Sequence, residues 1–205
     1  VTGVQTCALP IWPNILVVHA SFAARSVAEL IAAAKAKPGE IGFAGAGSGS
    51  TPHLAGELFN TMAGVRMVHV PYKAAQQIVS DIVGNQIDLA LLVPSTGLPH
   101  IKAGKMRALG LTVGERIAAS PDIPPVSDVP ELKGYNVTTS IGMFVPVKTP
   151  TAISDRLNRE LNSILALPDV RKPFEDQAAT VGKGSGAEYA EFLRKELAQI
   201  GRAHV

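Results

Sequence analysis

The sequence is poor in cysteine, aromatic residues and charge, and it lacks long apolar runs. Its single cysteine, Cys7, excludes a disulfide framework and a cysteine metal cluster. With 5% aromatic residues and a net charge of +2, it offers neither a stacking platform for bases nor a basic face, so we expect no nucleic-acid partner. No apolar run approaches the roughly 20 residues that span a bilayer. The remaining composition, 46% hydrophobic and 18% charged over 205 residues, indicates a globular protein with a sizeable core.

The two ends of the chain look like translated sequencing adapter. Residues 6–11 can be encoded by ACG TGT GCT CTT CCG ATC. The reverse complement of that DNA, read one base out of frame, encodes residues 200–205. We therefore expect residues 1–12 and 200–205 to be non-native, and we exclude them from the fold prediction.

Between these ends, apolar runs alternate with amphipathic stretches, which is typical of a mostly parallel α/β sheet covered on both faces. Strands are expected at 14–19, 41–44, 67–70, 87–93 and 106–111, and helices at 27–37, 52–63, 75–83 and 98–103. A proline-rich connection at 112–134 and an extended run at 137–147 follow, and helices near 150–165, 169–177 and 186–199 complete the chain.

The most informative stretch is the glycine-rich turn Gly45-Ala46-Gly47-Ser48-Gly49-Ser50-Thr51 between a strand and a helix. Thr51 is expected to cap the helix, with Pro52 as its first residue. Free backbone N–H groups and small hydroxyls would then face an anion at the positive end of the helix. The turn matches neither the dinucleotide fingerprint nor the P-loop, and it lacks the central serine of a nucleophile elbow. A tight turn without a ligand is the alternative.

Two more junctions between a strand and a helix, at 71–73 and 94–96, should lie beside this turn. In a parallel sheet all three are found at the carboxyl edge, where open α/β sheets bind ligands. The candidate ligand-binding residues are Gly45, Gly47, Ser48, Gly49, Ser50, Thr51, His53, Tyr72, Lys73, Ser95 and Thr96. His53 could instead cap the helix, Lys73 could be a solvated charge, and Ser95 and Thr96 could stabilise their turn. His19, His69 and His100 are not spaced as ligands of one ion, so we expect no metal site and no cofactor.

Stretches 43–59, 68–73, 99–109 and 144–150 together resemble the extracytoplasmic solute-binding receptors of tripartite tricarboxylate transporters, the Bug family. The similarity covers residues 13–199. It implies a two-lobed, Venus-flytrap-like periplasmic-binding-protein fold that closes on a small organic anion, commonly a di- or tricarboxylate. Such a receptor delivers its ligand to membrane transporter subunits and is not an enzyme.

By the same resemblance, residues 13–142 would form the second ligand-binding lobe, nearly complete. Residues 143–199 would form the hinge return and the carboxyl-terminal helices of the first lobe. We expect a signal peptide and most of the first lobe upstream, a periplasmic location and a monomer. Two alternatives stay open: a hydrolytic or phosphate-handling α/β enzyme domain, whose general base would be His53 or Asp88, and an effector-sensing domain of a regulator.

Overall fold

The computed structural model describes residues 6–118, 120–182 and 184–203. The chain divides into two compact units. Unit 1 comprises Val1–Trp12 and Thr139–Gly201, and unit 2 comprises Pro13–Thr138 with Arg202–Val205. Within the described residues, no helix combines the length and the apolarity that crossing a membrane requires.

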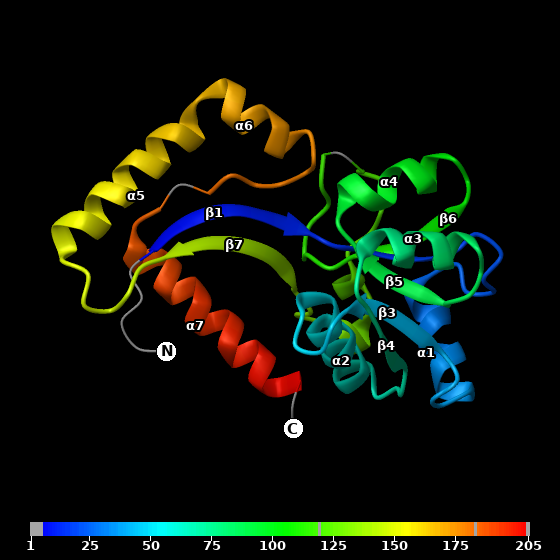
Figure 1. Ribbon diagram of the computed structural model, residues 1–205. Coiled ribbons are helices and arrows are strands. Elements are labelled where there is room, and N and C mark those ends of the chain that lie inside the picture. Colours follow the sequence, from blue (N-terminus) through cyan, green and yellow to red (C-terminus); the bar gives the residue numbers. More distant parts are fainter. Residues whose placement is uncertain (1–5, 119, 183, 204–205) are drawn as a thin grey trace. The chain divides into compact units, whose positions relative to one another are not determined.

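Unit 2 is built on a five-stranded sheet in the order β4-β3-β5-β2-β6 (Figure 1). The strands are β2 (Ile15–His19), β3 (Gly42–Ala46), β4 (Val68–Tyr72), β5 (Leu89–Leu92) and β6 (Met106–Leu111). Strand β3 pairs in parallel with β4 and β5, whereas β2 runs antiparallel to β5 and β6. The predicted α/β sheet is confirmed as a mixed one, in which four strands run the same way and β2 runs against them. The direction of β2 is a feature that its apolar pattern did not encode.

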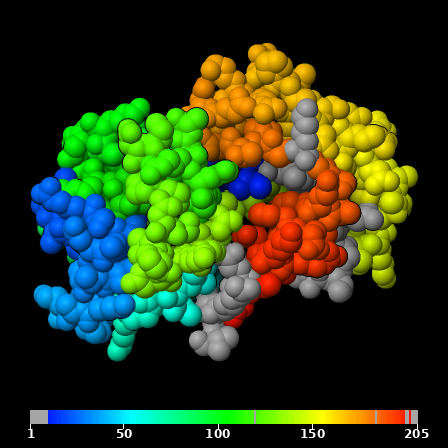
Figure 2. All heavy atoms as spheres, turned by 180° about the vertical axis from the view of Figure 1, so that it is seen from behind, coloured from blue at the N-terminus to red at the C-terminus, as the bar shows by residue number. Residues whose placement is uncertain are grey.

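Helices cover both faces of this sheet. The helices are α1 (Val27–Ala36), α2 (Thr51–Ala63), α3 (Ala75–Val83) and α4 (Pro94–Lys102). The apolar side chains of α1 and α2 pack on one face, and those of α3 and α4 pack on the other. The connection after β6 contributes two short 3-10 helices, η1 (Val126–Asp128) and η2 (Pro130–Leu132), to the first face. Figure 2 shows this connection in light green beside the blue of α1.

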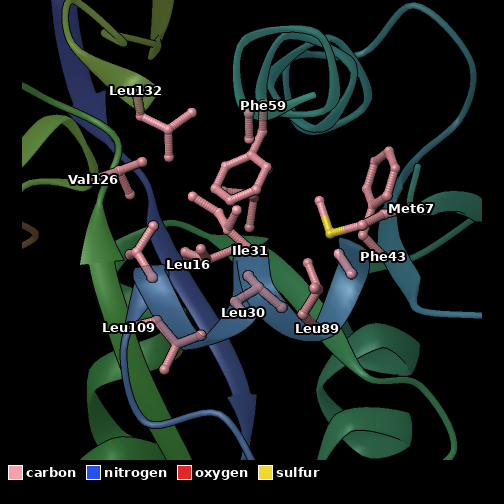
Figure 3. Packing of buried hydrophobic residues seen from close by; sticks show 14 of the residues in the cluster. Leu16, Leu30, Ile31, Phe43, Phe59, Met67, Leu89, Leu109, Val126 and Leu132 are labelled. Atoms are coloured by element: carbon pink, nitrogen blue, oxygen red, sulfur yellow. The ribbon is translucent and has the colours of Figure 1, made fainter. Parts of the chain in front are cut away.

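The core under α1 and α2 brings α2 close to the sheet. Figure 3 shows Leu30 and Ile31 of α1 and Phe59 of α2 meeting side chains of the sheet. Phe43 of β3 is fully buried, and α2 approaches its ring so closely that a Cβ atom on Gly56 would lie 2.2 Å from a ring carbon. The absence of a side chain at position 56 therefore allows α2 to lie on β3.

Two buried polar side chains connect the elements of unit 2. Asn60, near the end of α2, accepts the N–H of Met67 and donates to the carbonyl of Met67, both at 3.0 Å. Thr112, which is fully buried, bonds to both ends of the unit. Its backbone N–H donates to Asn14 O at 2.9 Å, and its Oγ1 accepts the N–H of Asn14 at 2.9 Å. Its hydroxyl donates to Val137 O at 2.5 Å, and its carbonyl accepts the N–H of Val137 at 2.8 Å.

In its described residues, unit 1 contains a two-stranded sheet and three helices. Strand β1 (Thr6–Pro13) pairs with β7 (Thr138–Phe144), and α5 (Thr151–Ala166), α6 (Pro168–Glu175) and α7 (Gly186–Ala203) follow. Tyr189 of α7 is buried, with its ring 6.0 Å from that of Phe144. Several large apolar side chains of this unit are exposed, among them Ile141, Val147, Ile153, Leu167 and Leu197.

Candidate functional site

The sheet brings the three predicted junctions to one edge. Strand β3 lies between β4 and β5 and is parallel to both, so the carboxyl ends of the three strands point the same way. The turn after β3 is therefore flanked by the chain that follows β4 on one side and by the chain that follows β5 on the other. Crevices at this edge of open α/β sheets are the usual place for a ligand.

The glycine-rich turn ends one residue earlier than predicted, because Ser50 and not Thr51 caps α2. The Oγ of Ser50 accepts the N–H of His53 at 3.5 Å, and its hydroxyl donates to Ala46 O at 2.8 Å. Thr51 is then the first helical residue and Pro52 the second. Gly49 explains the shift, since its φ of +83° reverses the chain immediately before Ser50.

The turn keeps several donors free. Within the described part of the chain, the N–H groups of Gly47, Ser48 and Thr51 have no hydrogen-bond acceptor. The N–H of Gly49, in contrast, donates to Nδ1 of His53 at 3.0 Å. The free donors precede or begin a helix of 13 residues, so its dipole favours negative charge at the same place. The turn can therefore bind an anion through its backbone.

Two imidazole rings lie directly under this turn. The ring centroid of His53 is 4.2 Å from that of His69 on β4. The ring centroid of Phe43 is 5.2 Å from that of His69. Nε2 of His69 is buried and has no hydrogen-bond partner among the described atoms. Burial, and next the proximity of His53, lower the pKa of His69. Gly45 permits this packing, because a Cβ atom there would lie 2.9 Å from Nε2 of His69.

The junction after β4 is part of the strand as far as Tyr72, two residues beyond the predicted end. The hydroxyl of Tyr72 donates to Asp81 Oδ2 on α3 at 2.8 Å. Burial and this bond to Asp81 raise the pKa of Tyr72 to about 12. The hydroxyl of Tyr72 is therefore already bonded to Asp81, which leaves its ring to face a ligand. The exposed Lys73 follows it in the chain.

The junction after β5 is helical and not a turn. Helix α4 begins at Pro94, four residues before the predicted start, so Ser95 and Thr96 belong to its first turn. Pro94 explains the difference, because proline suits the first position of a helix. The N–H of Thr96 donates to Val93 O at 3.0 Å. The hydroxyl side chains remain at the same sheet edge as the glycine turn.

The described residues contain no cluster of three histidine, cysteine or acidic side chains that could bind a metal ion. Asp88 accepts the N–H of Gly42 through Oδ2 at 2.7 Å. Gly42 is the first residue of β3, so this bond is at the opposite end of the strand from the glycine turn. Asp88 thus has a structural role in pairing the strands, which leaves His53 as the acid–base candidate at the turn.

Comparisons with known proteins agree with this architecture. A family profile described as "Tripartite tricarboxylate transporter family receptor" matches residues 4–203. A protein encoded between tcbD and tcbE in Pseudomonas sp. (strain P51) is 34% identical over 184 residues, which are 90% of this chain and 55% of that protein. The chain thus spans about half the length of that relative.

Solved structures show the same fold. R. palustris Rpa4515 with adipate aligns with a TM-score of 0.85 at 28% identity, over 98% of this chain and 68% of that one. The periplasmic binding protein BugD aligns with a TM-score of 0.79 at 26% identity, over 98% of this chain and 67% of that one. The fold is therefore of the α/β periplasmic-binding-protein type. With the profile matching nearly its whole length, this chain belongs to the family of tripartite tricarboxylate transporter receptors, the Bug family.

Proposed function

We propose that this chain is the ligand-binding part of a periplasmic solute-binding protein that captures a small organic carboxylate for a tripartite tricarboxylate transporter. The observation that carries the proposal is the glycine-rich turn, where the N–H groups of Gly47, Ser48 and Thr51 are unpaired within the described chain and lie at the start of helix α2. Membership of the receptor family supports it, as does the relative whose structure contains adipate. The protein would bind and release its ligand without covalent chemistry.

The energetics fit a carboxylate held by backbone donors. A micromolar receptor needs roughly −8 kcal/mol of binding free energy. Charge-assisted hydrogen bonds contribute about 1.5 to 3 kcal/mol each, so three or four donors at a helix end supply most of it where water is excluded. The ring of Tyr72, the ammonium of Lys73 and the hydroxyls of Ser95 and Thr96 would then contact the rest of the ligand.

We also propose that residues 13–142 are the second lobe of the receptor and that residues 143–199 return to the first. The exposed apolar side chains of unit 1, such as Val147, Ile153 and Leu197, support this assignment. Side chains of this kind normally pack against other protein, because leaving them in water costs free energy. The remainder of the first lobe would cover them, and it would also supply the other half of the binding site.

Ligand titrations followed by amide NMR test the proposal on the chain as it is. Adipate at millimolar concentration should shift the amide signals of Gly47, Ser48 and Thr51, and other di- and tricarboxylates should do so to different extents. Gly45→Ala should weaken the response at least tenfold, because the added Cβ would press on His69. Gly114→Ala is the matched control, since a Cβ there meets only Ser127 Oγ at 4.0 Å.

Two outcomes would contradict the proposal. Carboxylates that leave the amides of the turn unchanged would show that it is a structural turn without a ligand. Inorganic phosphate binding more tightly than every carboxylate would favour the phosphate-handling alternative.

A further inference from the structure

His53 contacts its own turn in a way that fixes the state of its ring. The N–H of Gly49 donates to Nδ1 of His53 at 3.0 Å. Nδ1 must therefore carry a lone pair, and the proton of the neutral ring is on Nε2. Nε2 lies 3.9 Å from Oε1 of Glu57, one helical turn further along α2. The contact with Gly49 exists only while His53 is neutral in this tautomer.

The position of the His53 ring is determined by its neighbours. His69 on β4 lies 4.2 Å from it between ring centroids, and Phe43 on β3 contacts His69 in turn. Burial, and next the proximity of His53, lower the pKa of His69 and so favour its neutral ring, against the opposing effect of Glu57. Gly45 leaves the space into which these rings fit. Packing of this kind holds a side chain in one rotamer, as a positioned functional group requires.

We infer that His53 is a positioning residue, whose neutral imidazole binds the amide of Gly49 and thereby holds the turn in its anion-accepting form. This inference rests on the proposed function. His53 would then act on the ligand indirectly, through the amide of Gly49, and not by direct contact as the sequence predicted. The amide of Gly49 is used inside the turn, and the amides of Gly47, Ser48 and Thr51 remain for the anion.

Protonation of His53 should release the turn. Nδ1 then becomes a donor, and the N–H of Gly49 loses its acceptor. The described titratable groups that face His53 are Glu57 from α2 and His69 from β4.

The test compares two substitutions in the full chain, His53→Asn and His53→Gln. The side-chain oxygen of asparagine can occupy the place of Nδ1, whereas the longer side chain of glutamine reaches toward the place of Nε2. We expect the Gly49 amide to exchange with solvent about fivefold faster in His53→Gln, the equivalent of one hydrogen bond. His53→Asn should recover most of this protection. Thermal unfolding of both variants checks that unit 2 stays folded.

A matched control is available at the opposite edge of the sheet. Nδ1 of His19, at the end of β2, accepts the N–H of Ser21 at 3.2 Å, which is the same type of contact. His19→Gln removes that contact and should change neither the Gly49 amide nor the response to adipate.

Adipate titration adds the functional readout. Its affinity should fall about fivefold in His53→Gln and recover largely in His53→Asn. If the unmodified chain binds no carboxylate, the proposed function fails, while the Gly49 amide still decides the role of His53. The inference is wrong if His53→Gln leaves the Gly49 amide as protected as before, or if Asn and Gln expose it equally, since ring packing alone would then explain the turn.

Discussion

Gly56 provides a sharp test of how α2 packs on the sheet. A Cβ atom at this position would lie 2.2, 2.4 and 2.7 Å from three ring carbons of Phe43, which is fully buried. Replacing glycine with alanine inside a helix gains about 1 kcal/mol of helix propensity. Overpacking a core costs about 1 to 3 kcal/mol, and contacts this short with a confined ring place Gly56→Ala at the upper end. We therefore expect a net loss of about 2 kcal/mol.

Gly97 in α4 is the matched control for Gly56. The nearest atoms to its added Cβ, on Leu92, Val17 and Ile101, would be 3.7 to 3.9 Å away, which is ordinary contact. Gly97→Ala should therefore keep the propensity gain and stabilise unit 2 by up to about 1 kcal/mol. The same substitution in two helices of one unit is thus expected to have opposite signs.

Hydrogen exchange in urea, followed by mass spectrometry, can measure both effects on peptides from α2 and β3. Trp12, the single tryptophan, belongs to unit 1, so its fluorescence reports separately on that unit. Phe43→Leu combined with Gly56→Ala should cost less than the sum of the two single changes, because the smaller side chain relieves the contact. A Gly56→Ala chain as stable as the unmodified protein would refute the packing that we describe.

Three further predictions concern titrating and buried polar groups. Because folding lowers the pKa of His69, the unfolded chain takes up the imidazole proton first as the pH falls. The stability contributed by neutral His69 is therefore fully present above pH 6.5 and is lost below it. Urea midpoints on either side of pH 6.5 should show this slope, and His69→Phe should remove it. The pKa of Tyr72 is about 12 in the folded chain against an ordinary 10.0, so the unfolded chain loses this proton at a lower pH. Stability should therefore fall as the pH rises above 10.0. Tyr72→Phe should reduce that alkaline slope in the same assay, while buried Tyr135, whose pKa is also raised, supplies the remainder. An unchanged slope would assign all of it to other groups. Asn60→Ala leaves both backbone groups of Met67 without their partner and should cost about 2 kcal/mol or more in thermal unfolding, whereas no loss would mean that water replaces the side chain.

Much of unit 2 follows from local signals in the sequence. A capping residue of the type that the sequence favours begins α1: Ser26 Oγ accepts the N–H of Glu29 at 3.2 Å, while Oε2 of Glu29 accepts the N–H of Arg25. The apolar runs became strands because a buried strand needs little else than continuous β-branched and apolar residues. The direction of β2 was not predictable in this way, since an apolar run has the same pattern in either direction.

The geometry of the candidate site was predictable only where its residues are contiguous in the chain. The glycine-rich turn is one stretch, so its place between a strand and a helix could be inferred, although the choice of Ser50 over Thr51 as the cap depended on the backbone at Gly49. The role of His69 could not be inferred. It depends on the register of two strands that places His69 beside Phe43, and register is set by pairing and not by local sequence.

The hydrogen bonds of Thr112 have a consequence for how unit 2 can be handled as a piece of protein. They hold Asn14 and Val137 next to each other, so the chain enters and leaves the unit at neighbouring points. A module with adjoining ends can be inserted into a host chain, or cut out and closed on itself, with little loop entropy to overcome. A few residues joining its ends, with a new opening in the exposed turn at Gly104, would give a circular permutant that keeps every strand pairing of the sheet.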